Sequence, residues 1–294
     1  MDKPNGEMKM DTVEKVKKSQ VDEKAVAGRL HDYFSKFSGA IIAYSGGVDS
    51  ALLAYAAHRA MGEHMVAAIA DSPSLARREY RSAVSFAQEH GIPLQIVRTD
   101  EMKNPFYQAN AGNRCYYCKK ALFEKLDELR DQLEDARPQT SWPILYGVNM
   151  DDLTDHRPGA QAAEEADVKA PFTDLGIDKK TIRSLCAYYG LEIAEKPAMP
   201  CMSSRIQYGE KVTEEKLSQV EQAEDFLYDL GFRILRVRHH GDTARIEVMP
   251  QDFDKLLELR EAILERFQDI GFIYISMDLK GFKSGSLNAA LEDK

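Results

Sequence analysis

Short apolar segments alternate with helical patterns along most of this chain. Four of these segments have the composition of buried strands, namely "GAIIAY", "MVAAIA", "LQIVRT" and "ILYGVN". Helical patterns follow them in "ALLAYAAHRA", "ARREYRSAVSFAQEHG", "KKALFEKLDELRDQL" and "TIRSLCAYYG", and apolar spacing predicts one more helix ahead of them, through Val26, Leu30, Tyr33, Phe34 and Phe37. Strands that alternate with helices form a parallel sheet covered on both faces. We therefore expect an α/β fold.

The pattern changes after the proline-rich stretch "EKPAMPCMSSR". A helix in "TEEKLSQVEQAEDFLYDLG", a hairpin in "FRILRVRHHGDTARIEVMP", a helix in "DFDKLLELREAILERFQDIG" and a strand in "FIYISMD" predict a second, smaller α/β unit. The expected organisation is a mobile N-terminus at 1–20, a first domain at 21–195, a linker at 196–205 that carries Cys201, and a C-terminal substrate and oligomerisation domain at 206–294.

Composition narrows the classes of function. The net charge of −9 disfavours nucleic-acid binding, and the longest apolar runs are too short to cross a membrane. The first residues, "MDKPNGEMKMDTVEKVKKSQ", lack the apolar core of a signal peptide, so we expect a cytoplasmic protein. In that reducing compartment, four cysteines favour a metal or catalytic role over disulfides.

The hexapeptide "SGGVDS" follows the first predicted strand directly. Its two glycines allow a tight turn, and Ser45, Ser50 and the free N–H groups at the helix start form a cradle for an anion. A plain strand-to-helix turn is the alternative. The pattern is not a Walker A loop, because the lysine motif is absent. It resembles the PP-loop of the ATP pyrophosphatases, which cleave ATP between the α and β phosphates.

This resemblance implies a binding site for ATP with Mg²⁺ at the carboxyl ends of the strands. Asp49 would help to hold the magnesium and pyrophosphate region, and "IADSPS" would seat the adenosine. The residues implied to bind ATP are Ala43, Ser45, Gly46, Gly47, Asp49, Ser50, Asp71, Ser72 and Gly147.

The four cysteines divide into two kinds. Cys115 and Cys118 form a C-x-x-C, and Cys201 lies in the predicted linker, whereas Cys186 falls on the apolar side of a helix and is expected in the core. Structural zinc normally takes four protein ligands, while a [4Fe–4S] cluster held by three cysteines leaves one iron open. A redox C-x-x-C and two unliganded thiols are the remaining alternatives.

The motifs G-x-N-x-D-D in "YGVNMDD", "RPG" before a helix, and "KPAMPCMSSRI" resemble the sulfur transferases that make the nickel-pincer nucleotide cofactor. The resemblance implies that ATP adenylates the carboxylates of a pyridinium dicarboxylate mononucleotide and that sulfide replaces AMP, giving thiocarboxylates. It implies catalytic roles for Cys201, Asp49 and Ser50, and a [4Fe–4S] cluster on Cys115, Cys118 and Cys201. A separate sulfide donor and a homo-oligomer are also implied.

Members of that family are of two kinds. One kind has only a cysteine like Cys201 and sacrifices its sulfur, leaving dehydroalanine. The other also has the C-x-x-C and holds the cluster, and this sequence has the second pattern. Met202 and Ser203 stand where leucine and alanine are expected, which is a small departure.

The hairpin in the second domain turns at Gly241-Asp242. That register places Arg238 opposite Arg245 and Arg236 opposite Glu247 on one face of the sheet. Facing arginines repel unless an anion lies near them, so the face is either solvated or a site for the substrate phosphate. The resemblance supports a substrate site formed by Arg236, Arg238, Glu224 and Glu247. From the pattern alone, Glu224 is equally well explained as a helix-edge residue.

Three rival functions remain at this stage. A tRNA thiolase of the same superfamily is disfavoured by the acidic net charge and by the lack of an RNA-binding appendage. An ATP-dependent amide synthase leaves the three cysteines without a role. A regulatory nucleotide-binding module needs no open-iron cluster.

Overall fold

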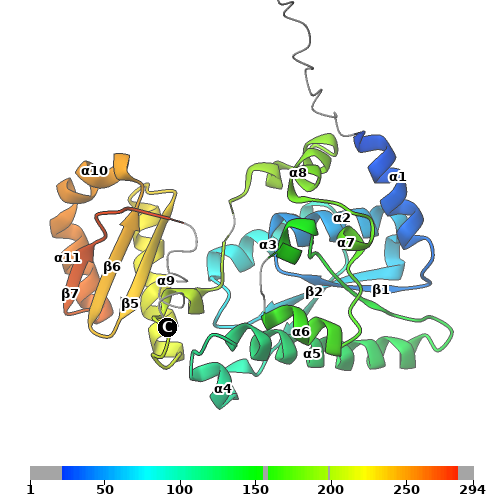
Figure 1. Cartoon of the computed structure of the whole chain (residues 1–294), viewed down its shortest axis with the longest axis horizontal. Helices are drawn as coiled ribbons and strands as arrows, with labels where there is room; N and C mark the ends of the chain where they lie inside the picture. The colour runs from blue at the N-terminus through cyan, green and yellow to red at the C-terminus, as the bar shows by residue number, and fades with distance from the viewer. Residues whose placement is uncertain (1–21, 155–157, 198, 284–294) are drawn as a thin grey trace, which may run out of the picture.

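The computed structural model describes residues 22–154, 158–197 and 199–283. The predicted mobile N-terminus at 1–20 lies outside these residues. Figure 1 shows two lobes side by side, a larger one built on strands β1 to β4 and a smaller one built on β5 to β7. None of the described helices combines the length and the apolarity that crossing a bilayer requires.

The sheet of the larger lobe confirms the predicted parallel arrangement. Its four strands run in the order β3-β2-β1-β4, and every neighbouring pair is parallel. Strand β1 is buried along its whole length and sends Ile42 into one core and Ile41 into the other. The strands are β1 (Ala40–Tyr44), β2 (Met65–Asp71), β3 (Leu94–Arg98) and β4 (Ile144–Tyr146).

Helices cover both faces of this sheet, as the alternation predicts. The core on one face includes residues of α1, α2, α3 and α8, and the core on the other includes residues of α5 and α6. The helices of this lobe are α1 (Glu23–Phe34), α2 (Val48–Met61), α3 (Arg77–Glu89), α4 (Pro105–Gln108), α5 (Arg114–Ala136), α6 (Pro158–Glu165), α7 (Pro171–Asp174) and α8 (Lys179–Tyr188). Helix α5 starts earlier than the sequence pattern suggested, so Cys115 and Cys118 lie at its beginning.

The smaller lobe is a three-stranded sheet packed on helices. Strand β5 (Leu235–His240) pairs antiparallel with β6 (Thr243–Val248), which pairs parallel with β7 (Tyr274–Met277). The helices are α9 (Glu214–Asp229), α10 (Phe253–Glu258) and α11 (Arg260–Ile270). The sequence pattern predicted α10 and α11 as one helix, and the structure divides it at Leu259.

Single 3₁₀ turns connect many of these elements. They are η1 (Gly62–His64), η2 (Glu101–Lys103), η3 (Met150–Thr154), η4 (Glu192–Glu195), η5 (Met202–Arg205) and η6 (Pro250–Asp252). The turn η5 belongs to the predicted linker, yet it is not a solvated tether. Met202, Ser203 and Arg205 are buried in it, and the Met202 N–H donates to the Ser74 carbonyl at 2.8 Å.

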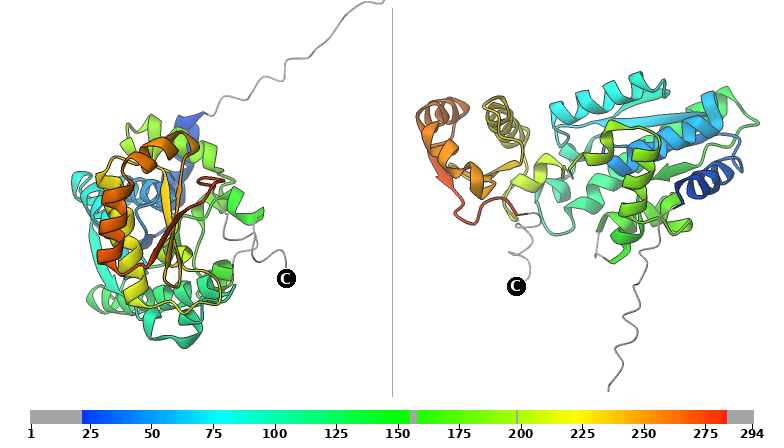
Figure 2. Two further views of the ribbon diagram at one scale, coloured as in Figure 1. Left: turned by 90° about the vertical axis from the view of Figure 1, so that its left-hand side faces the viewer. Right: turned by 90° about the horizontal axis from the view of Figure 1, so that it is seen from above.

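The two lobes also meet at the surface, where α3 faces α9. Arg78 Nε lies 3.1 Å from Asp225 and Arg78 Nη2 lies 3.2 Å from Asp229, and the Arg78 guanidinium lies 4.8 Å from the Tyr228 ring centroid. The Arg77 N–H donates to Glu221. Figure 2 shows the smaller lobe at one end of the larger one.

Candidate active site

The loop between β1 and α2 presents unused N–H donors. Gly47 caps α2 without a side-chain hydrogen bond, so the first-turn N–H groups have no capping acceptor from that residue. Ser50 Oγ accepts from the Ser45 N–H at 3.1 Å and donates to the Gly47 carbonyl at 3.1 Å, which holds the loop in shape. Gly46 has φ +74°, and a Cβ there would collide with Ala83 Cβ. Glycine is therefore required for the loop to pack against α3.

The other residues implied to bind ATP lie at the same edge of the sheet. Gly147 follows β4, and a Cβ there would lie 3.0 Å from Asp49 C and from Ser50 N. Asp71 ends β2, where its carboxylate pairs with Arg77 at 2.5 Å, and an open cleft of about 470 Å³ adjoins it. Ser72 is buried, and its hydroxyl donates to Glu101 instead of facing the cleft. The strand ends thus gather these residues around the loop.

Two lysines that the sequence argument missed reach this loop. Lys179 Nζ lies 2.6 Å from both carboxylate oxygens of Asp49, and the Lys179 N–H donates to Asp151 at 2.8 Å. Lys196 Nζ donates to the Gly46 carbonyl at 2.9 Å and pairs with Glu79 at 2.8 Å. Both ammonium groups add positive charge beside the N–H donors, as an anion site requires.

The three candidate ligand cysteines lie in one neighbourhood. Cys115 and Cys201 are exposed, and Cys118 is partly exposed. Burial raises the pKa of the Cys118 thiol to about 12, and nearby Cys201 and Glu101 add to that rise. Burial of Arg114 opposes its charge, yet Cys201 and Cys115 raise its pKa overall. The Arg114 guanidinium, which donates to the Ser203 carbonyl at 2.9 Å, is thus the cation nearest to these thiols by this measure.

The donor set fits an iron–sulfur cluster in kind but not as a preformed site. In the ranges that the structure describes, no three His, Cys, Asp or Glu side chains lie close enough together to hold a metal ion. Cys201 precedes η5 and Cys115 begins α5, so their sulfurs come from two segments of the chain. A cluster would require small side-chain movements to bring the thiolates together.

Cys186 is a core residue, as predicted. It is fully buried in α8, and burial raises the pKa of its thiol to about 11. Its neighbours on that helix face, Ile182 and Leu185, are equally buried. This cysteine is therefore separate from the three candidate ligands.

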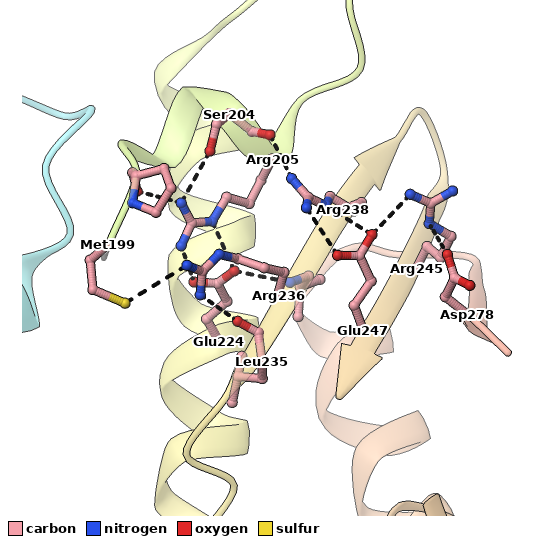
Figure 3. A network of polar contacts seen from close by, with 12 residues as sticks. Met199, Ser204, Arg205, Glu224, Leu235, Arg236, Arg238, Arg245, Glu247 and Asp278 are labelled. Atoms are coloured by element: carbon pink, nitrogen blue, oxygen red, sulfur yellow. Dashed lines mark hydrogen bonds and ion pairs between the residues drawn. The ribbon is translucent and has the colours of Figure 1, made fainter. Parts of the chain in front are cut away.

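The predicted hairpin register is confirmed, with Arg238 opposite Arg245 and Arg236 opposite Glu247. The alternative of a solvated face is wrong for the predicted site residues, because Arg236 and Arg238 are each only 5% exposed and Glu247 is fully buried. Figure 3 shows that Glu247 lies between the facing arginines, at 2.9 Å from Arg238 Nη2 and 3.0 Å from Arg245 Nη2. The anion that the facing arginines need is thus supplied in part by the chain itself.

Glu224 also has a partner that sequence reasoning did not assign. Arg205 Nε and Nη2 donate to its two carboxylate oxygens at 3.0 and 3.1 Å, and the Val237 N–H donates to it at 2.9 Å (Figure 3). Burial lowers the pKa of Arg236, and the charge of Arg205 lowers it further. Positive charge is therefore concentrated here, which is the condition for recognising a phosphate.

The segment around Cys201 touches both lobes. On one side, the Met202 N–H bonds to Ser74 of the larger lobe. On the other, Arg205 Nη1 donates to the Cys201 carbonyl at 3.1 Å, and Arg238 Nη1 donates to the Ser204 carbonyl at 2.9 Å. The signal for Arg205 was present in the motif "KPAMPCMSSRI", which ends on it and the next residue.

Comparison with known proteins places this site in a class. Residues 20–125 match the NAD synthase family. One polypeptide of the glutamine-hydrolyzing GMP synthase of Methanopyrus kandleri is 28% identical over 63% of this chain and 60% of its own length. With a PP-loop at the carboxyl end of a parallel sheet, the chain is an ATP-using enzyme with a PP-loop ATP pyrophosphatase domain.

Two longer matches define the family. An uncharacterized protein of Synechocystis sp. is 43% identical over 89% of this chain and 96% of its own length. The pyridinium-3,5-bisthiocarboxylic acid mononucleotide synthase of Lactiplantibacillus plantarum is 32% identical over 85% of this chain and 89% of its own length. The chain belongs to the family of that synthase, the PP-loop sulfur transferases of nickel-pincer nucleotide biosynthesis, as its motifs indicated.

Proposed function

We propose that this enzyme adenylates the carboxylates of a pyridinium dicarboxylate mononucleotide and converts them to thiocarboxylates. The observation that carries the proposal is the position of the Cys201 segment. It is hydrogen-bonded to the loop after β2 in the larger lobe and to Arg238 in the smaller lobe. A sulfur source there lies between a nucleotide loop and an arginine-rich substrate face.

The first step uses the phosphate loop. A substrate carboxylate oxygen attacks the α-phosphorus of ATP, the bond from that phosphorus to the bridging oxygen breaks, and pyrophosphate leaves with Mg²⁺. The N–H groups at the start of α2 and the hydroxyl of Ser50 would bind the phosphates, and Asp49 would hold the metal. Lys179 would then exchange its contact with Asp49 for one with phosphate.

The smaller lobe would orient the substrate by its phosphate. Arg236 and Arg238 are nearly buried, so a phosphate held by them exchanges little charge with water. Glu224 and Glu247 fix the arginine set through Arg205 and Arg238, at 3.0 and 2.9 Å. Charge-assisted contacts of this kind are the strong class of hydrogen bond.

Sulfur would arrive at the three cysteines. A [4Fe–4S] cluster on Cys115, Cys118 and Cys201 would supply an exchangeable sulfide at an iron that the protein does not ligate. The segment around Cys201 would hold the acyl adenylate carbon beside that sulfur, and AMP would leave as the carbon–sulfur bond forms. The separate sulfide donor, the homo-oligomer and the cytoplasmic location stay predictions.

The adenylation step is tested with Asp49→Ala and Ser50→Ala. Both variants should lose substrate-dependent pyrophosphate release and keep the far-ultraviolet spectrum of the wild type. Asp254→Ala is the matched control, because Asp254 is an exposed acidic residue in the first turn of α10. Normal pyrophosphate release by both loop variants would contradict the proposed nucleotide site.

The sulfur source is tested by iron and acid-labile sulfide per chain after anaerobic reconstitution. Alanine at Cys115, Cys118 or Cys201 should remove iron, and alanine at Cys186 should not, because Cys186 lies in the core. The sacrificial mechanism predicts the opposite signature. In that case the iron-free wild type would complete one turnover and lose the mass of one hydrogen sulfide at Cys201.

A further inference from the structure

The segment that carries Cys201 is anchored to the larger lobe on both sides of the cysteine. Before it, Lys196 Nζ donates to the Gly46 carbonyl in the phosphate loop at 2.9 Å. After it, the Met202 N–H donates to the Ser74 carbonyl at 2.8 Å. Both anchor points belong to loops at the strand ends where the nucleotide is expected.

The first anchor is held in place from a second direction. Arg183 of α8 donates to the Ala194 carbonyl and, at 3.0 Å, to the Lys196 carbonyl. The backbone at Lys196 is therefore fixed, and its ammonium group spans from α8 to the phosphate loop and to Glu79 of α3, 2.8 Å away. The Lys196 side chain is only 17% exposed, so its charge is poorly screened by water.

The second anchor extends into a buried polar network. Tyr107 Oη lies 2.5 Å from Ser203 Oγ and 2.5 Å from Ser74 Oγ. Ser74 and Ser72 both donate to Glu101, which is 1% exposed and has one carboxylate oxygen without a hydrogen-bond partner. A continuous chain of hydrogen bonds thus joins the turn after Cys201 to the end of β2.

We propose that Lys196 is a positioning residue that couples ATP occupancy of the phosphate loop to the placement of Cys201. A bound triphosphate competes with the Gly46 carbonyl and with Glu79 for the ammonium group. Because the backbone of Lys196 is fixed by Arg183, movement of that side chain is transmitted along the segment toward Cys201. The inference rests on the proposed function only for the location of ATP.

The test measures alkylation of Cys201 by iodoacetamide in the reduced, iron-free protein, with and without saturating Mg²⁺ and α,β-methylene ATP. Peptide mass spectrometry separates Cys201 from the other cysteines. In the wild type the analogue should change the Cys201 rate by about fivefold or more, the lower end of usual coupling between sites. Lys196→Gln should reduce that change to less than about 1.5-fold, Lys196→Arg should restore most of it, and Lys180→Gln should behave as the wild type.

Lys180 is the matched control because it is an exposed lysine beside Lys179 at the start of α8. Calorimetric titration with the same analogue reports nucleotide binding independently, so a failed coupling is distinguished from a misplaced ATP site. A full response in Lys196→Gln, or none in the wild type, would overturn the proposal.

A reciprocal measurement uses the wild type alone and avoids any folding defect of a variant. Coupling free energies are symmetric, so alkylating Cys201 must change the affinity for the analogue by the same factor. Equal analogue affinities before and after alkylation would also overturn the proposal.

Discussion

The two lobes handle charge in opposite ways. In the larger lobe, Lys179 and Asp49 form a pair whose side chains are 34% and 25% exposed. In the smaller lobe, Arg205 and Glu224 form a pair at 1% and 5% exposure. A partly hydrated pair is exchanged for a ligand at small cost, whereas a buried pair is expensive to break. The first arrangement suits a site that must admit Mg²⁺ and pyrophosphate, and the second suits a site that must keep its shape.

The largest effect should come from breaking the buried pair. Glu224→Ala leaves Arg205 buried without its bidentate partner, and we expect the free energy of unfolding to fall by about 3–5 kcal/mol. Urea denaturation measures it. The control is Arg260→Ala, which removes a pair at 63% and 82% exposure and should cost no more than about 1 kcal/mol. Equal losses in the two variants would remove the contrast between buried and hydrated pairs.

The next effect concerns substrate affinity. Arg236→Ala should weaken binding of the mononucleotide by about one to two decades, because a charge-assisted contact contributes about 1.5–3 kcal/mol. Affinity for ATP should not change. Arg233→Ala is the control, since Arg233 is exposed just before β5. Calorimetry with each ligand separates the outcomes, and equal losses for both ligands would indicate a folding defect.

A smaller effect is expected at the phosphate loop. Gly147→Ala places a Cβ 3.0 Å from the backbone of Asp49 and Ser50, so the loop must shift. We expect about a tenfold loss of ATP affinity, equivalent to about 1.4 kcal/mol, with little change in unfolding. Gly28→Ala is the control because nothing lies within 4 Å of its added Cβ. Unchanged ATP affinity in Gly147→Ala would show that the loop tolerates the shift.

The smallest effect should come from Cys186→Ala. Its side chain is fully buried, and its removal should cost on the order of 1 kcal/mol of stability without loss of iron. Thermal unfolding and iron analysis are measured on the same sample. Loss of iron in this variant, with the fold intact, would require Cys186 to be added to the candidate ligands.

Local signals explain what the sequence could predict. The turn at Gly241-Asp242 fixes the hairpin register because only two residues connect the strands, and the structure has that register throughout. The apolar alternation likewise predicted the parallel sheet, and the glycine pair predicted the loop. Each of these features is decided by residues close together in the chain.

The missed residues depend on long-range proximity. Lys179 and Asp49 are 130 residues apart, and Lys196 and Gly46 are 150 apart. No periodicity or turn signal links such positions, because the path of the chain over the sheet decides which of them meet. Glu101 was missed for the same reason, since its partner Ser72 follows a different strand.

The contact between α3 and α9 has a consequence for how the lobes respond to their solution. Arg78 is 43% exposed and its partners Asp225 and Asp229 are 34% and 77% exposed. At about 0.15 M ionic strength the Debye length is about 8 Å, so added salt screens these pairs further. It leaves the buried Arg205 and Glu224 pair almost untouched. Ionic strength should therefore change the angle between the lobes, with the segment around Cys201 serving as the pivot.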